Sequence, residues 1–255
     1  MAAGTCHDLG NLSKEEFYEK YTIIERLHFD LYADIAVYKT LDRVKDQIVV
    51  IKLASNHEEL DFEINTACNL QNFDLLRKYT DSLFKINEFG TRDDKIGFFV
   101  MPLYHGPIWR YKEFNYREEL ETVFELLLAV VVLNMSGIIH GDLHAGNIMY
   151  EKVQYKRQYT INGTKFLCIS DTIPVVIDFG RSIMGSKLET INSKDANYLV
   201  NRVFLRIHDQ IFKSLIPRLK RDKSFNILLN PIFQPLIDTS LEGGDLVKVF
   251  ESFDI

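Results

Sequence analysis

The segment from Gly137 to Tyr150, which has the sequence GIIHGDLHAGNIMY, constrains this chain more than any other stretch. It holds His140, Asp142 and Asn147 in the order H-x-D-x-x-x-x-N. This spacing indicates a loop that presents a carboxylate base and an amide metal ligand one short turn apart. A fold built around such a loop has to bring further charged groups to it from other parts of the chain.

Two further segments supply charged groups of that kind. VVIKLA, residues 49–54, places Lys52 in an apolar strand, and VVIDFG, residues 175–180, places Asp178 after a run of β-forming residues. Phosphoryl transfer from a nucleotide depends mainly on positioning and charge neutralisation. It needs a cation for the phosphates, oxygen ligands for Mg²⁺ and a base for the accepting hydroxyl. The order Lys, Asp-(x)4-Asn, Asp-Phe-Gly therefore predicts a phosphoryl-transfer site.

Each predicted role follows from the chemistry of one side chain. Lys52 supplies the cation for the phosphates, and Asp142 supplies the base. Asn147 and Asp178 are the predicted Mg²⁺ ligands, because this ion prefers oxygen ligands and keeps several waters beside them. The predicted cofactors are therefore ATP and Mg²⁺.

Lys52 needs a carboxylate partner to orient it. We choose Glu63, which lies 11 residues further on in a segment with helical spacing of apolar residues, with Glu59 one turn earlier as the alternative. Taken singly, these residues have ordinary structural explanations: a lysine at a strand end is usually at the surface, and His140 alone is usually a satisfied buried histidine. Their joint occurrence in this order favours the functional interpretation.

Over nearly its whole length, on the motifs VVIKLA, HGDLHAGN and VVIDFG, the chain resembles the eukaryotic-type protein kinase superfamily, at its atypical edge. The resemblance implies an α+β, two-lobed fold: a small β-rich N-lobe with one main helix, and a larger, mainly helical C-lobe. It also implies that ATP binds between the lobes. The residues that match the nucleotide-binding positions are Val37 and Val50 in the pocket, Met101 at the gatekeeper position, and Leu103 and Tyr104 in the hinge.

A narrower resemblance is to the haspin-like Ser/Thr kinases. These also have a histidine two residues after the catalytic aspartate, as His144 has here, and an insertion before the metal-binding aspartate that matches YTING, residues 159–163. The separation of Asn147 from Asp178, 178 − 147 = 31 residues, fits such an insertion. The resemblance implies a Ser/Thr protein kinase.

The chain departs from the superfamily in two places. Asp30, Tyr32 and Ile35 stand where a glycine-rich loop would have its glycines, so backbone amides should approach phosphates less closely. Gly141 replaces the arginine that in regulated kinases pairs with a phosphorylated activation segment, which predicts constitutive activity. Either Asp195 or Asn197 matches the buried helical aspartate that supports the catalytic loop.

We expect one kinase-like domain over residues 1–255. Its predicted parts are an N-terminal arm (1–20), loose as far as about residue 14, an N-lobe (21–101), a hinge (102–107) and a C-lobe (108–255). Ser13 followed by Glu16 predicts a capping box at a helix start. In the C-lobe we expect a buried helix from Tyr116 to Met135 and a hairpin that turns at Asn162-Gly163.

Composition and charge narrow the partners. The net charge of −6 argues against non-specific binding to nucleic acid or to anionic membranes. Cys6, Cys68 and Cys168 are far apart and in no metal-ligand spacing, which favours a reducing intracellular compartment, cytoplasmic or nuclear. We find no signal-peptide pattern at the N-terminus, and the longest apolar run is too short to span a bilayer. We expect a monomer that acts on a protein substrate.

Three hypotheses from different classes fit these observations. The first is an active Ser/Thr protein kinase with Asp142 as the base. The second is a pseudokinase scaffold, which the missing glycine-rich loop favours. The third is a small-molecule phosphotransferase, because HGDLHAGN resembles the loops of aminoglycoside and choline kinases as well.

Overall fold

In the computed structural model the chain folds into two compact units. The N-terminal unit comprises Met1–Phe73 and Phe84–Tyr104, and the C-terminal unit comprises Asp74–Leu83 and His105–Ile255. The last boundary between the two units falls between Tyr104 and His105. The described residues are 6–32, 34–55, 57–72, 81–108, 121–122, 125–126, 128–129, 133, 138–143, 145–161 and 164–184.

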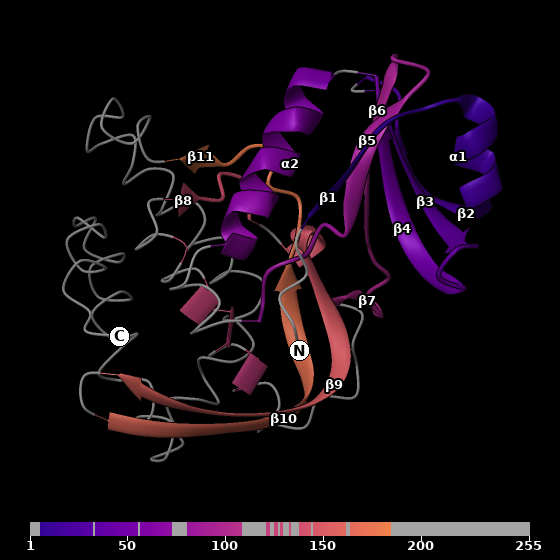
Figure 1. The fold of residues 1–255 in the computed structure, drawn as a ribbon. Helices are drawn as coiled ribbons and strands as arrows, with labels where there is room; N and C mark the ends of the chain where they lie inside the picture. Colours follow the sequence, from indigo (N-terminus) through magenta and orange to yellow (C-terminus); the bar gives the residue numbers. More distant parts are fainter. Residues whose placement is uncertain are drawn as a thin grey trace. The chain divides into compact units, whose positions relative to one another are not determined.

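The N-terminal unit is an α+β structure around a six-stranded sheet (Figure 1). The strand order is β1-β5-β6-β4-β3-β2, and all neighbouring pairs are antiparallel except β1 and β5, which are parallel. The strands are β1 (His7–Leu12), β2 (Tyr21–Asp30), β3 (Ile35–Asp42), β4 (Gln47–Ala54), β5 (Glu88–Arg92) and β6 (Ile96–Pro102). The segment VVIKLA, residues 49–54, lies in β4, which confirms the strand predicted for Lys52.

Two helices lie on opposite faces of this sheet (Figure 1). Helix α1 (Lys14–Lys20) begins with the predicted capping box, in which Ser13 and Glu16 each accept a hydrogen bond from the other's backbone N–H. Its Phe17 is buried in a core cluster together with alternate residues of β4. Those residues are Val49, Ile51 and Leu53. Because strand side chains alternate, Val50 and Lys52 point to the other face, where helix α2 (His57–Asn72) packs.

Strand β1 corrects the prediction of a loose arm up to about residue 14. His7 is in register with Glu88 of β5, and the parallel pairing continues to Leu12. The strands come very close at one point, where a Cβ atom added to Gly90 would lie 2.5 Å from the carbonyl oxygen of Gly10. The sequence carries no turn signal for this pairing, because parallel strands are not joined by a tight turn and so lie far apart in sequence. The arm is therefore part of the sheet.

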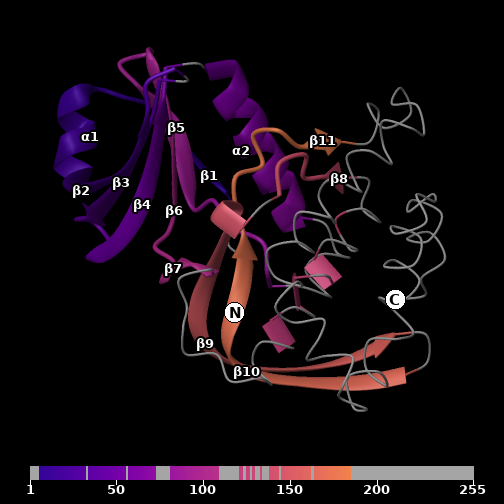
Figure 2. The same ribbon diagram turned by 180° about the vertical axis from the view of Figure 1, so that it is seen from behind.

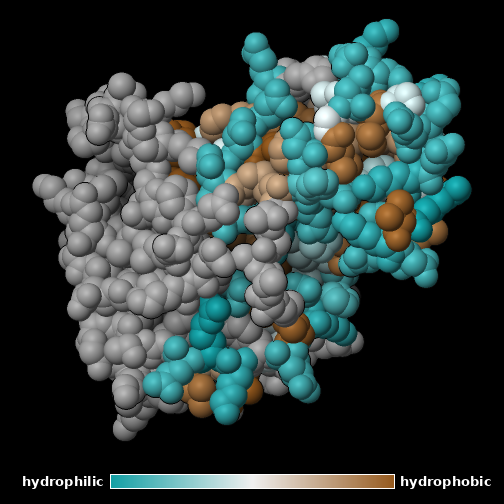
Figure 3. Space-filling model, viewed as in Figure 1, coloured by the Kyte–Doolittle hydropathy of each residue, from teal (hydrophilic) through white to brown (hydrophobic). Residues whose placement is uncertain are grey.

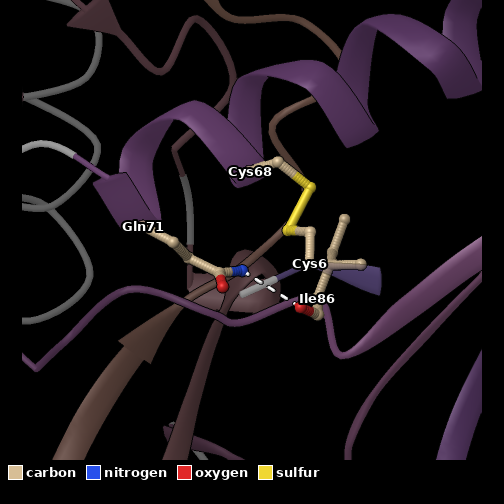
Figure 4. The surroundings of a disulfide bond; sticks show 4 residues. All are labelled: Cys6, Cys68, Gln71 and Ile86. Carbon is tan, nitrogen blue, oxygen red and sulfur yellow. Dashed lines mark hydrogen bonds between the residues drawn. A yellow bond between two sulfur atoms is a disulfide. The ribbon is translucent and has the colours of Figure 1, made fainter. Parts of the chain in front are cut away.

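A disulfide joins Cys6 to Cys68 and so ties the start of β1 to helix α2 (Figure 4). The two Cα atoms are 5.7 Å apart although the residues are 62 positions apart in sequence. Nearby, the Gln71 side chain donates a hydrogen bond to the Ile86 carbonyl oxygen at 3.3 Å. This finding corrects the interpretation of the cysteines as reduced: the pairing of β1 with β5 brings Cys6 to α2, and Cys168 is a buried cysteine outside this disulfide.

The described part of the C-terminal unit is dominated by a long antiparallel hairpin (Figure 2). Strands β9 (Ile148–Ile161) and β10 (Thr164–Val176) pair from Ile148↔Val176 to Ile161↔Thr164. This confirms the predicted hairpin, whose turn residues Asn162 and Gly163 lie outside the described residues. Strand β7 (Gly106–Pro107) pairs with β9, and the short strands β8 (Ile138–Ile139) and β11 (Ile183–Met184) pair with each other.

Several predictions for this unit fall wholly or partly on residues that the structure does not describe. Within the expected helix at 116–135, the described residues Glu121, Thr122, Glu125, Leu126, Leu128, Ala129 and Leu133 are helical and buried. His144, Asp195, Asn197 and most of the predicted helical C-lobe lie outside the described residues. Among the described helices, none is both long and apolar enough to cross a membrane.

The surface of the described residues is largely hydrophilic on the face shown in Figure 3. Strand β2 forms one edge of the sheet, and most of its residues are exposed. The exposed large hydrophobic residues of β2 and the turn after it are Ile23, Ile24, Leu27, Phe29, Leu31 and Tyr32.

Candidate active site

The loop after β8 is organised by the buried side chain of His140. Its Nε2 lies 2.9 Å from the carbonyl oxygen of Ile177, and its Nδ1 lies 3.3 Å from the backbone nitrogen of Asp142. Since a carbonyl only accepts and a backbone N–H only donates, these contacts fit the neutral ring with the proton on Nε2. His140 therefore links the backbone of Asp142 to the segment that leads into Asp178.

Asn147 makes the second link between the same two segments. Its side-chain Nδ2 donates to the Asp142 carbonyl oxygen at 3.0 Å, and its own carbonyl accepts from the backbone N–H of Ile177 at 3.0 Å. The hairpin explains this closeness, because pairing of Ile148 with Val176 places the two flanking residues side by side. Asp142 and Asn147 thus lie in one hydrogen-bonded cluster with Ile177, the residue directly before Asp178.

The 31-residue separation of Asn147 from Asp178 is taken up almost wholly by β9 and β10. A long insertion can be placed there because an antiparallel hairpin returns the chain to its starting point. Asp178 follows at a backbone φ of 65°, the left-handed region that non-glycine residues seldom adopt. Such conformations concentrate at functional sites, where the surrounding structure imposes them.

Arg181 is a site residue that was not predicted from the sequence. Its Nη1 lies 3.6 Å from Oδ2 of Asp142. Gly141 has a φ of 77°, and a Cβ atom added to it would lie 2.1 Å from the Arg181 carbonyl oxygen. The only signal in the sequence was a basic residue directly after Asp-Phe-Gly, and the spacing alone did not indicate its partner.

The N-terminal unit carries the predicted cation and its carboxylate. Lys52 Nζ lies 2.6 Å from Oε2 of Glu63, on the α2 face of the sheet, and also lies over the Phe99 ring at 5.8 Å from its centre. Both side chains are largely buried, with 13% of Lys52 and 4% of Glu63 exposed. The structure therefore pairs Lys52 with Glu63, our first choice over Glu59.

The other predicted nucleotide-binding residues of this unit lie on neighbouring strands. Val37 of β3 is in register with Lys52 of β4, and Val50 is in register with Met101 of β6. Leu103 and Tyr104 follow β6, and the Tyr104 hydroxyl accepts a hydrogen bond from the Lys85 backbone N–H at 3.4 Å. These side chains thus come from three adjacent strands and the segment after them.

The turn between β2 and β3 occupies the position at which the sequence lacks a glycine-rich loop. The Asp30 carboxylate accepts a hydrogen bond from the Tyr32 backbone N–H at 2.9 Å. Asp34 has a φ of 50°, and its carboxylate accepts a hydrogen bond from the Ser55 hydroxyl. The Asp30 carboxylate thus takes up one amide of the turn, which is then not available to a phosphate, and the Asp34 carboxylate is bonded to Ser55 beyond the end of β4.

The residues of the C-terminal unit fit a Mg²⁺ ion that is also held by phosphates. Since Asn147 Nδ2 is occupied by the Asp142 carbonyl, its Oδ1 is the end that remains to face a cation. Among the residues that the structure describes, no group of three or more His, Cys, Asp or Glu forms a metal site of its own. Two oxygen ligands with phosphate and water suit Mg²⁺, which is often bound in this way.

Comparisons with known proteins give little beyond this geometry. No family model and no curated protein matches the chain. Among solved structures, the chain is similar to a crystal structure of a kinase domain, with a TM-score of 0.49 and 17% sequence identity. The match covers 66% of this chain and 52% of that one, so this chain spans about half the length of the solved domain.

Proposed function

We propose that this protein is a kinase-like phosphotransferase that transfers the γ-phosphoryl group of ATP to Ser or Thr hydroxyls of a protein substrate. The observation that carries the proposal is the bracing of Asp142, Asn147 and the Ile177–Asp178 segment by His140 and by Asn147 itself. The close pair of Lys52 and Glu63 supports it from the other unit.

Under this proposal each residue has one task. Asp142, which is 25% exposed, orients the acceptor hydroxyl and takes its proton. Lys52, held by Glu63, binds the phosphates, and Asn147 Oδ1 and the Asp178 carboxylate hold Mg²⁺. When bound, the ion neutralises charge on the phosphate oxygens. The chain's contribution is thus positioning and electrostatic stabilisation rather than covalent chemistry.

The choice of protein hydroxyls rests on the resemblance to haspin-like kinases. It is supported by the long insertion, here the β9–β10 hairpin that contains Tyr159 and Thr160 of the YTING segment. A small-molecule phosphotransferase would use the same base on a sugar or alcohol hydroxyl. The test must therefore also determine whether the acceptor is a protein hydroxyl or the hydroxyl of a small molecule.

The test is a radiolabelled-ATP assay with mixed protein substrates, run beside a panel of aminoglycosides and small alcohols. We expect wild-type protein to label protein, and Asp142→Asn to lower the rate by several orders of magnitude. Asp171→Asn makes the same chemical change at an exposed position of β10 and should keep the wild-type rate. Equal labelling by wild type and Asp142→Asn would refute Asp142 as the base, and labelling of small alcohols alone would refute a protein acceptor.

A second candidate, a scaffold without catalysis, is favoured by one observation. The β2–β3 turn has no glycine, and its Tyr32 amide is bonded to the Asp30 carboxylate, so with Asp30 and Asp34 it offers phosphates fewer amides and more negative charge. Under this alternative a thermal-shift titration with ATP and Mg²⁺ gives no shift, and the radiolabel assay is blank. A shift with ATP and Mg²⁺ that Lys52→Met abolishes would count against the scaffold.

A further inference from the structure

Arg181 lies beside Asp142, the proposed catalytic base, but the proposed function gives Arg181 no role. Its Nη1 is 3.6 Å from Asp142 Oδ2, and 74% of its side chain is exposed. An ion pair this open to water contributes little to folding stability. Its position next to the reacting group therefore calls for another explanation.

The main chain around Arg181 is held firmly even though its side chain faces water. Gly141 packs against the Arg181 carbonyl so closely that no larger residue fits without a shift. The Phe179 carbonyl accepts hydrogen bonds from both the backbone N–H and the hydroxyl of Ser182, at 3.0 and 2.7 Å. Ile183 then pairs with Ile139 in the β8–β11 ladder. These contacts fix the main chain of Arg181, and so the point from which its side chain extends, beside the loop that carries Asp142.

We infer that Arg181 is a further catalytic residue, which binds the transferred phosphoryl group and stabilises its charge in the transition state. The inference rests on the proposed function. In that reaction the acceptor oxygen forms a bond to the γ-phosphorus while the bond from phosphorus to the β,γ-bridging oxygen breaks. ADP leaves with that electron pair, and the acceptor proton passes to Asp142.

The geometry of that step brings Arg181 within reach. To give up its proton, the acceptor oxygen must lie roughly 2.6–3.2 Å from the Asp142 carboxylate, and the phosphorus lies in line with that oxygen. A guanidinium beside the same carboxylate is then close to the equatorial phosphoryl oxygens. Its planar set of N–H donors matches them, and arginine is less strongly hydrated than lysine.

The main chain of Arg181 is thus fixed, while its side chain remains open to a ligand.

The test compares Arg181→Ala and Arg181→Lys with wild type and with Arg157→Ala. Arg157 pairs with Asp81 at 2.9 Å in the same unit and serves as the matched control. Two readouts need no protein acceptor: slow hydrolysis of ATP by water, and calorimetric binding of ADP with Mg²⁺, with and without aluminium fluoride as a mimic of the transferred phosphoryl group. We expect Arg181→Ala to lower hydrolysis and acceptor labelling alike, by about 10²-fold or more. It should abolish the gain in affinity from aluminium fluoride while leaving ADP binding unchanged, and Arg181→Lys should restore part of both.

Four results would overturn the inference. If Arg181→Ala matches Arg157→Ala in hydrolysis and in aluminium fluoride binding, the residue is only half of a surface ion pair. If only the KM for the protein acceptor rises, Arg181 recognises the substrate and not the phosphoryl group. If Asp142→Asn is inactive while Arg181→Ala is fully active, the inference fails and the proposed function stands. A wild type that neither hydrolyses ATP nor binds ADP would overturn both.

Discussion

Gly141 lies so close to Arg181 that a Cβ atom added to it would stand 2.1 Å from the Arg181 carbonyl oxygen. Its φ of 77° is also one that other residues seldom adopt. We therefore expect Gly141→Ala to destabilise the C-terminal unit by more than the roughly 1–3 kcal/mol that such a backbone conformation costs alone. The loop carrying Asp142 should also shift, so activity should fall at least tenfold. Thermal unfolding and the radiolabel assay measure the two effects.

Gly10→Ala is the matched control for this experiment. Gly10 has a φ of 67° but nothing lies within 4 Å of an added Cβ, so it isolates the backbone cost. We expect it to be destabilised by about 1 kcal/mol and to keep its activity. If Gly141→Ala loses no more stability and no more activity than Gly10→Ala, the close packing of Gly141 against Arg181 does not hold the loop.

The pair of Lys52 and Glu63 allows a structural effect to be separated from a catalytic one. Removing one partner leaves a buried, unpaired charge, which usually costs about 3–5 kcal/mol. We expect Lys52→Met and Glu63→Leu each to be destabilised to about this extent, and the double variant to regain most of the loss. Activity should stay low in all three, because the phosphates lose their cation or its orientation. Urea unfolding and the kinetic assay measure the two effects.

The activity of the double variant shows whether the pair of Lys52 and Glu63 has a catalytic or only a structural role. Recovery of activity along with stability would mean that the pair only supports the fold. Lys45→Met, at a partly exposed lysine that binds Glu88, is the control for loss of a lysine from the same unit and should keep its activity.

The parts of the fold and of the candidate site that could be predicted are those that depend on local patterns in the sequence. Strand β4 and the segment after it showed apolar spacing, so Lys52 and Glu63 could be placed on a strand and a helix that pack together. Asp142 and Asn147 are five residues apart, so their closeness needed no knowledge of the fold. The hairpin that brings Asp178 back to them was predicted from its turn residues.

What could not be predicted depends on contacts between distant segments. The pairing of His7 with Glu88 joins strands 81 residues apart (88 − 7) in parallel, and no turn marks such a pairing in the sequence. The disulfide of Cys6 follows from that pairing. Arg181 could not be placed at Asp142 because the contact depends on the backbone of Gly141, whose φ is invisible in the sequence.

The disulfide between Cys6 and Cys68 should contribute measurably to the stability of the N-terminal unit. Closing a loop of this length in the unfolded chain is worth about 2–4 kcal/mol. We expect dithiothreitol to lower the melting temperature of the wild type but not that of the double variant Cys6→Ser, Cys68→Ser. Cys168→Ala, which removes the cysteine outside the disulfide, should stay sensitive to the reductant. Three reactive thiols in protein unfolded without reductant would contradict the bond.

The carboxylate of Glu88 should make the N-terminal unit sensitive to acid. Its burial alone would raise its pKa, but hydrogen bonds from Lys45, Tyr21 and Lys20 outweigh this and lower the pKa from about 4.5 to about 2. A depressed folded-state pKa stabilises the fold above the unfolded value and loses that contribution as the pH falls. Over the window from pH 4.5 to pH 2 this amounts to about 3 kcal/mol.

Glu88→Gln should therefore be less stable than wild type at pH 6, and the difference should shrink as the pH falls towards 2. Urea unfolding at a series of pH values measures this, with Glu19→Gln, at an exposed glutamate of α1, as the control that keeps the wild-type profile. A constant difference between Glu88→Gln and wild type across the window would show that folding does not lower the pKa of Glu88. The hydrogen bonds at 2.5 Å from Tyr21 and 2.6 Å from Lys45 would then stabilise the ionised and the protonated carboxyl to the same extent.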